Sequence, residues 1–304
     1  MDYILSTDNI TKRYGKQYAA DSISIHIPQG AIYGLIGRNG AGKTTLLKMI
    51  GGLATPTSGS FSFFGKTGKE ANPYMSRIGL LIEAPGLYPN MSAYKNLKVK
   101  CLAVGINKKG YIEDLLETVG LADTGNKPVK KFSLGMKQRL GIALALVGEP
   151  DFMILDEPIN GLDPQGIVEV REIISKLNTE RNITFIISSH ILEELAKIST
   201  NYGIIHNGKL LQELTKDELL EKCSEHIELR TDNTSKACTV LDEIGITKYK
   251  VVSSDTIQIF ERLTESGEIT VALAQNGVKT LGIVVKNEAL EDYFINLTGG
   301  AANV

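Results

Sequence analysis

The chain has 304 residues, 42% of them hydrophobic and 22% charged, with a formal net charge of −2. This is the composition of a globular protein with room for one large and one small domain, and its charge excludes a strongly basic nucleic-acid surface. No apolar run approaches the roughly 20 residues that cross a bilayer, and the N-terminus lacks the pattern of a signal peptide. An odd number of cysteines, Cys101, Cys223 and Cys238, without metal-type spacing predicts a soluble chain in a reducing compartment.

The first part of the chain contains two kinds of predicted strand. Residues 22–27 alternate apolar and polar side chains before Pro28-Gln29-Gly30, which predicts an antiparallel strand closed by a turn. The continuous apolar run 31–36 predicts a buried strand. Residues 44–50 are apolar at helical spacing and predict a helix.

Between that buried strand and helix, Gly37 to Thr45 match G-x-x-x-x-G-K-[ST], the phosphate-binding P-loop. Backbone N–H groups of such a loop surround phosphate oxygens, and the helix N-terminus adds its positive dipole end. Lys43 is expected to reach the β- and γ-phosphates, and the Thr44 hydroxyl to ligate Mg²⁺. The alternative is a glycine-rich turn that merely precedes a helix, but the lysine and threonine stand in register after the last glycine. The motif predicts binding of a nucleoside triphosphate.

Further along the chain, strands and helices alternate. Residues 60–65 predict another strand, and residues 92–121 are mostly helical by their apolar spacing. From 138 to 210 the pattern becomes helix, strand, helix, strand. The apolar runs 152–155 and 183–187 fit parallel strands buried on both faces.

After about residue 215 the pattern changes again. A short charged helix is expected over 216–222, followed by an arrangement of strand, helix and strand that occurs twice. The expected strands are 226–231, 247–253, 256–261 and 278–285, and the expected helices are 235–244, 265–276 and 288–297. This arrangement predicts a small α+β sandwich of about 75–80 residues. Its Cys223, Cys238 and His226 are scattered single residues without a catalytic pattern.

Two polar motifs directly follow buried strands. The strand 152–155 runs into Asp156 and Glu157, at the carboxyl end where open α/β sheets bind ligands. Asp156 is expected to support Mg²⁺, and Glu157 to act as the general base for the attacking water. Taken alone, these residues could simply be two solvated acids at the end of a strand. A P-loop, however, needs an acidic motif as its partner. His190 similarly follows the strand 183–187, although a lone histidine is more often a capping or core residue.

A serine–glycine motif, Ser133 and Gly135, lies between the P-loop and the acidic pair. Ser133 alone would be an ordinary helix N-cap. With the other motifs in the same order over residues 3 to about 215, however, the chain resembles the nucleotide-binding subunits of ABC transporters. In that family this signature grips the γ-phosphate held by the opposite subunit.

The resemblance implies an α/β fold: a P-loop ABC-ATPase domain over 1–215, with a mixed sheet, an antiparallel β lobe and a RecA-like core. A helical signature subdomain would occupy about 84–150, and a small α+β accessory domain 216–304. It also implies residue roles. Tyr14 matches the aromatic that stacks on adenine, although it could be an ordinary surface tyrosine, and His190 matches the γ-phosphate switch. Residues that match the cradle for ATP and Mg²⁺ are Gly37, Asn39, Gly40, Ala41, Gly42, Lys43, Thr44, Thr45 and Asp156, and the loop between subunits is 161–163.

Two departures from the family pattern narrow the resemblance. Glu83 stands where glutamine is usual; a carboxylate there can still ligate Mg²⁺ or orient water, but it adds negative charge beside the phosphates. The alternative is drift, with Glu83 facing solvent. Glutamate at this place resembles the lantibiotic (bacteriocin) immunity exporters. The signature residues Leu134, Met136 and Lys137, with the tail 288–300, resemble the bacitracin-resistance branch.

The sequence therefore predicts a homodimeric ATPase subunit, peripheral on the cytoplasmic face of the bacterial membrane, that drives export of a peptide antibiotic. Its expected partners are a second ATP-binding subunit and an integral membrane permease, contacted between Glu83 and Val104, and no nucleic acid. The alternatives are the ATPase subunit of another ABC exporter, or a soluble ABC ATPase acting on ribosomes or DNA. A non-hydrolysing binding module is disfavoured by Lys43, Asp156 and Glu157.

Overall fold

The computed structural model describes residues 3–223, 225–286 and 290–298. It divides the chain into two compact units, residues 1–216 and 217–304. Within the described ranges, no helix is long and apolar enough to cross a membrane.

The centre of the first unit is a six-stranded sheet in the order β11-β10-β4-β9-β8-β7. From β10 to β7 neighbouring strands are parallel, and β11 pairs antiparallel with β10. Every residue of β4, β8 and β9 is buried, because layers cover both faces of a parallel sheet. The strands are β4 (Ile32–Ile36), β7 (Ile78–Leu81), β8 (Phe152–Asp156), β9 (Thr184–Ser189), β10 (Asn201–His206) and β11 (Lys209–Thr215).

A second, antiparallel sheet has the order β2-β1-β5-β6, with β3 also paired to β1. Its strands are β1 (Tyr3–Tyr14), β2 (Gln17–Ile23), β3 (His26–Pro28), β5 (Ser58–Phe63) and β6 (Lys66–Thr67). The prediction of one strand over 22–27 was wrong. Ser22 has a φ of 52°, and the Thr7 hydroxyl donates to the Ile23 carbonyl and accepts from the Ile25 N–H. These bonds replace a continuous ladder.

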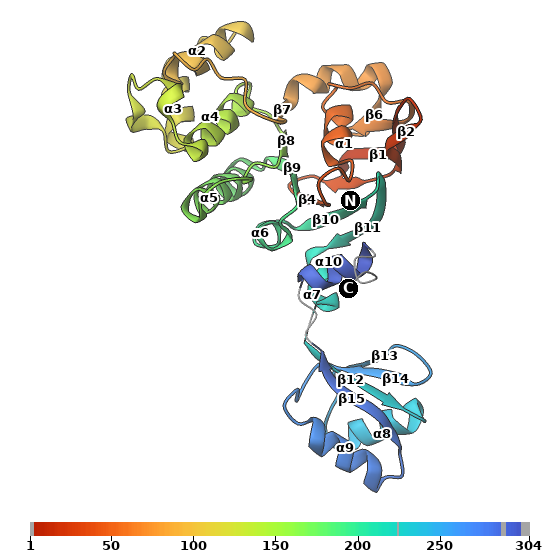
Figure 1. Ribbon diagram of the computed structural model, residues 1–304. Helices are drawn as coiled ribbons and strands as arrows, with labels where there is room; N and C mark the ends of the chain where they lie inside the picture. The colour runs from red at the N-terminus through yellow and green to blue at the C-terminus, as the bar shows by residue number, and fades with distance from the viewer. Residues whose placement is uncertain (1–2, 224, 287–289, 299–304) are drawn as a thin grey trace. The chain divides into compact units, whose positions relative to one another are not determined.

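The helices of the first unit are α1 (Lys43–Ile50), α2 (Ala93–Ala103), α3 (Tyr111–Thr118), α4 (Leu134–Leu146), α5 (Pro164–Arg181) and α6 (Leu192–Ala196). Short 3₁₀ segments cover Gly68–Arg77, Ala122–Thr124 and Val129–Lys131. Helices α2, α3 and α4 pack on one another beyond the β7 side of the central sheet (Figure 1). The predicted helical stretch 92–121 is two helices, because Gly105 and Gly110 adopt positive φ angles of 76° and 81° between them.

Apolar side chains of both sheets form one core with α1. Leu46, Leu47, Met49 and Ile50 of α1 are fully buried in it. Burying such side chains contributes roughly 1.5–3 kcal/mol each. The helix that follows the P-loop is therefore anchored along its apolar side, which fixes the position of the loop.

The second unit contains a four-stranded antiparallel sheet in the order β13-β14-β12-β15. Its elements are α7 (Lys216–Lys222, which begins at the unit boundary), β12 (His226–Thr231), α8 (Thr234–Glu243), β13 (Tyr249–Val251), β14 (Thr256–Ile259), α9 (Ser266–Gln275), β15 (Thr280–Lys286) and α10 (Leu290–Leu297). The β-α-β-β-α-β chain order with this strand order is ferredoxin-like. Apolar residues of the sheet and of α8 and α9 form a separate core. The expected last helix began at 288, and residues 288 and 289 lie outside the described residues.

Candidate nucleotide-binding site

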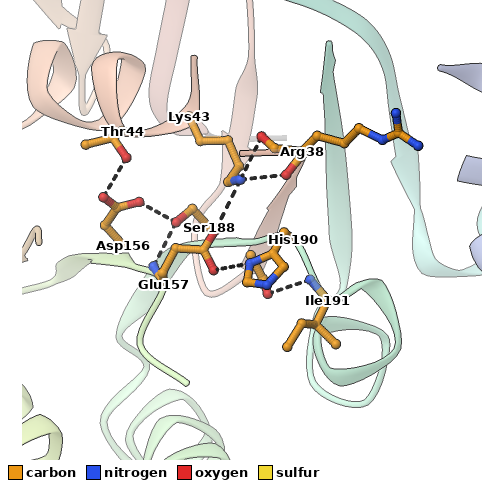
Figure 2. Close-up of polar contacts among 10 residues, drawn as sticks. Arg38, Lys43, Thr44, Asp156, Glu157, Ser188, His190 and Ile191 are labelled. Carbon is orange, nitrogen blue, oxygen red and sulfur yellow. Dashed lines mark hydrogen bonds and ion pairs between the residues drawn. The ribbon is translucent and has the colours of Figure 1, made fainter. Parts of the chain in front are cut away.

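Four adjacent parallel strands deliver polar residues to one edge of the central sheet. The P-loop follows β4, Glu83 follows β7, Asp156 ends β8 with Glu157 directly after it, and His190 follows β9. Parallel strands end at the same edge, so segments far apart in the chain meet there. This edge gathers the P-loop and the acidic motif in one place (Figure 2).

The P-loop glycines are needed where the backbone is crowded. Gly42 has a φ of 106°, and a Cβ on it would lie 2.3 Å from the Ala19 carbonyl oxygen. A Cβ on Gly37 would lie 2.5 Å from the Ile205 carbonyl oxygen. Real Cβ atoms do not come so close, so only glycine allows the loop to fold tightly against its neighbours. The loop then leads directly into the N-terminus of α1, a place that favours phosphate.

Lys43 is the buried cation of the site. It is 5% exposed, and its Nζ donates to the carbonyl oxygens of Gly37 at 2.5 Å and Arg38 at 3.3 Å. The same atom lies 3.1 Å from Oε1 of Glu157, as Figure 2 shows. A buried ammonium is tolerable only with such partners. Lys43 is thus held across the P-loop with its charge directed at the acidic end of β8.

Thr44 and Asp156 form the second contact between the P-loop and β8. The Thr44 hydroxyl donates to Asp156 Oδ2 at 2.7 Å. Ser188 donates to Asp156 Oδ1 at 2.5 Å, and its Oγ accepts from the Glu157 N–H at 2.9 Å. A hydroxyl and a carboxylate side by side are the hard oxygen ligands that suit Mg²⁺. These donors therefore fit the predicted metal.

Glu157 lies between a lysine and a histidine. Its Oε2 is 2.9 Å from Nδ1 of His190, while Oε1 faces Lys43. Among the described residues Oε1 is buried without a hydrogen-bond partner, and the Lys43 ammonium is the charge that faces it. The φ of Glu157 is 48°, an uncommon conformation for a residue other than glycine. The carboxylate is thus held between two side chains, with Lys43 at one oxygen and His190 at the other.

Glu83 forms an ion pair that the sequence did not suggest. Its Oε1 lies 2.5 Å from Nζ of Lys48 in α1. The hydrogen bond with Glu83 raises the pKa of Lys48. Glu83 is therefore tied to the helix that follows the P-loop.

A cavity of about 370 Å³ opens over the P-loop. Its lining joins the P-loop and Glu157 to residues of the β1–β2 and β10–β11 hairpins: Gln17, Tyr18, Ala19, Asn207 and Gly208. The Gly208 N–H donates to the Ala41 carbonyl at 2.9 Å, so the second hairpin lies on the P-loop. Tyr14, at the end of β1, is 57% exposed and is not part of this lining; Nζ of Lys12 lies 5.2 Å from its ring centre.

Ser133 and Gly135 lie at the start of α4, where Ser133 is the N-cap and its Oγ accepts from the Met136 N–H at 3.2 Å. Among the described residues no hydrogen bond or ion pair joins Ser133 to the P-loop. The signature instead meets the loop 161–163, because a Cβ on Gly161 would lie 3.3 Å from Cδ2 of Leu134. Asp163 of that loop caps α5. The two predicted intersubunit motifs are therefore neighbours in one chain.

The sequence missed several residues of this site. Ser188 could have been found, since two small polar residues, Ser188 and Ser189, follow the apolar run of this strand directly before His190. Lys48 carried no signal of its own, because a lysine in the last turn of a helix is ordinary. The hairpin residues that line the cavity meet the P-loop only through the tertiary structure.

Comparisons with known proteins agree with this geometry. The family model for ABC transporters matches residues 20–160. The chain is 44% identical to the bacitracin transport ATP-binding protein BcrA of Bacillus licheniformis, over 99% of both chains. It is 45% identical to the lantibiotic transport ATP-binding protein SrtF of Streptococcus pyogenes, over 214 residues that are 70% of this chain and 92% of the relative. The structure of cbiO1 from Clostridium perfringens, part of the ABC transporter complex cbiONQ, matches with a TM-score of 0.65 at 27% identity, over 73% of this chain and 92% of that one.

Proposed function

The chain belongs to the ATP-binding proteins of ABC transporters, and on that premise we propose that it powers a membrane exporter of a peptide antibiotic of the bacitracin type. Its activity is ATP hydrolysis, the activity of this family. The observation that carries the proposal is the extent of the match to BcrA, which includes the unit 217–304. SrtF is matched over 214 residues that already make up 92% of its length. The second unit therefore favours the bacitracin branch over the lantibiotic branch.

We assign the site residues as follows. Lys43 and the P-loop N–H groups bind the phosphates, and Thr44 and Asp156 would hold Mg²⁺, which would neutralise phosphate charge. Glu157 is the general base: it orients the attacking water and accepts the proton that the water loses. The water oxygen bonds to the γ-phosphorus as the bond to the β-phosphate oxygen breaks, and ADP and phosphate are released. His190 holds Glu157 in position through Oε2.

The arrangement of the signature supports a homodimer. Ser133 makes no polar contact with its own P-loop among the described residues, and the N-terminus of α4 is accessible, with Leu134 52% exposed. A helix N-terminus favours a phosphate group. In a two-fold dimer, Ser133 and Gly135 of each subunit would complete the site of the other. Subunits of this family generally act as such pairs, together with a membrane permease.

The surface between Glu83 and Val104 is the proposed contact with the permease. One side of α2 packs on the core through Leu97 and Cys101, which are buried. The same segment leaves large apolar side chains exposed: Tyr88 52%, Tyr94 37%, Leu102 63% and Val104 48%. Clustered exposed apolar groups are typical of a partner surface. The chain would thereby be held on the cytoplasmic face of the membrane.

Resistance measurements test this function. The chain is co-expressed in a sensitive host with a multi-span membrane protein that co-purifies with it, and the minimal inhibitory concentrations of bacitracin and of a lantibiotic are measured. We expect several-fold protection against bacitracin that is lost in Glu157→Gln. Protection against the lantibiotic alone would overturn the choice of branch, and protection against neither would indicate another exporter.

A further inference from the structure

Two lysines of α1 each hold one glutamate at the edge of the central sheet. Lys43, at the start of the helix, pairs with Glu157 at 3.1 Å, and Lys48, in its last turn, pairs with Glu83 at 2.5 Å. The sequence singled out Lys43, Glu157 and Glu83, but not Lys48. The second pair is also a lysine with a glutamate, and its glutamate follows β7, the strand next to β8.

The backbone repeats the same geometry at the two glutamates. Strands β7 and β8 are parallel neighbours with Leu81 opposite Leu155, and each glutamate follows two residues later. Both adopt a left-handed backbone, with φ of 63° at Glu83 and 48° at Glu157. Few residues other than glycine adopt this conformation. Glu83 thus leaves its strand in the same manner as the proposed general base leaves the next one.

The two pairs differ in their access to water. The side chains of Lys43 and Glu157 are 5% and 20% exposed, whereas those of Lys48 and Glu83 are 33% and 64% exposed. The outer pair is therefore the more solvent-exposed one, and its two residues are not among those that line the cavity over the P-loop. An exposed pair adds little to folding stability, so a contribution to stability does not account for this contact.

The charges of this cluster explain why a lysine is needed next to Glu83. Asp156, Glu157 and Glu83 supply three carboxylates at this sheet edge; Lys43 pairs with Glu157 and Lys48 with Glu83, while Asp156 accepts from hydroxyl groups. A nucleoside triphosphate brings further negative charge. Without Lys48, the carboxylate of Glu83 would face that charge uncompensated.

We propose that Lys48 is a positioning residue of the nucleotide site: it holds the Glu83 carboxylate beside the strand end that carries Glu157 and cancels its charge, so that the carboxylate does not repel the bound phosphates. The proposal rests on the assignment of the P-loop as the ATP site. The competing explanation is that Lys48 only complements the negative C-terminal end of α1. That effect does not depend on Glu83, so the two explanations predict different double mutants.

Nucleotide binding by four full-length proteins tests the proposal: wild type, Lys48→Met, Glu83→Gln and the double variant. The chain has no tryptophan, so the Kd for MgATP is measured by calorimetry. We expect Lys48→Met to weaken binding about tenfold, the effect of one nearby unpaired charge. Glu83→Gln in the same chain should restore binding to within about twofold of Glu83→Gln alone, because no carboxylate is then left to neutralise.

Two controls separate the possible failures. Thermal melting should shift by less than about 3 °C in all of these variants, because the pair is exposed. Lys43→Ala must abolish binding; if it does not, the assigned ATP site is wrong. If Lys43→Ala abolishes binding but Lys48→Met binds as wild type, or the double variant binds as weakly as Lys48→Met, the role of Lys48 is overturned.

Discussion

Ser188 lies directly opposite Asp156 on the neighbouring parallel strand, and its hydroxyl connects the two carboxylate residues of the site. It donates to Asp156 Oδ1 at 2.5 Å and accepts from the Glu157 N–H at 2.9 Å. Asp156 is 5% exposed, and its other oxygen accepts from Thr44. One serine of β9 thus fixes both the proposed metal ligand and the backbone of the proposed base.

Replacing Ser188 by alanine should therefore slow hydrolysis without preventing nucleotide binding. Both hydrogen bonds are lost and a buried carboxylate is left short of a donor, which costs about 1–3 kcal/mol of stability. We expect kcat to fall about tenfold or more, as for a displaced catalytic group, while the Kd for MgATP changes little. Phosphate release, calorimetry and urea unfolding measure these effects.

Ser189→Ala is the matched control for that substitution. The Ser189 hydroxyl accepts from the Ile191 N–H at 2.9 Å, and no hydrogen bond joins it to Asp156 or Glu157 in the described part of the chain. This variant should keep kcat near wild type. Equal losses of kcat in both serine variants would show that Ser188 acts only through general packing.

Glu157→Gln should abolish steady-state hydrolysis while ATP still binds. The amide keeps the shape of the side chain but cannot accept the proton of the attacking water, and losing a general base costs typically 10²–10⁴-fold. ATP that is bound but not hydrolysed should hold the subunits together, so gel filtration with MgATP should show a larger dimer fraction. Turnover at the wild-type rate would remove Glu157 from its assigned role.

Ser133→Ala should impair the dimer more than the fold. The N-cap of α4 loses its acceptor for the Met136 N–H, which costs about 1 kcal/mol, and the proposed grip on the opposite phosphate is lost as well. We expect a reduced ATPase rate and less ATP-dependent dimer, with MgATP still bound by the single subunit.

Ser92→Ala is the control for Ser133→Ala, because it also removes the side-chain acceptor of a helix N-cap. Ser92 is the N-cap of α2 and accepts from the Lys95 N–H at 3.3 Å, away from the proposed dimer contact. Its ATPase rate should stay near wild type. If Ser92→Ala and Ser133→Ala lower the rate equally, the effect of Ser133 is that of an ordinary helix cap.

Alkaline pH should destabilise the first unit through Tyr202. Burial raises the pKa of Tyr202 from 10.0 to about 12, so the folded state keeps a proton that the unfolded state loses above pH 10. Stability is therefore full below pH 10 and falls as the pH rises toward 12. Between pH 9 and pH 11 this group should remove about 1 kcal/mol of the free energy of unfolding.

Tyr202→Phe isolates that contribution. The variant loses the hydrogen bond from the tyrosine hydroxyl to the Ser199 carbonyl at every pH, so the change between pH 9 and pH 11 is the quantity to compare. Urea unfolding at the two pH values should show a smaller fall for Tyr202→Phe than for wild type. The same fall in both proteins would contradict the role of Tyr202.

Short contiguous segments of the sequence were enough to predict the family and most of the helices and strands. The glycines, lysine and threonine from Gly37 to Thr45 lie in one run, and the apolar strand before Asp156 is read from its own residues. Such motifs carry their function in local spacing, so the family could be predicted from the sequence, and the comparisons confirmed it. The helix and strand positions of the second unit followed from the same local periodicity.

Contacts between distant segments were decided by the tertiary structure alone. Ser188 and Asp156 are 32 residues apart, and Lys48 and Glu83 are 35 apart. The sequence predicted that strands exist but not that β9 lies between β4 and β8, and only that order places Ser188 beside Asp156. The break before Ile25 likewise depends on Thr7, a residue of another strand. Local periodicity reports which face of an element is apolar, whereas its partner is selected by packing of the whole core.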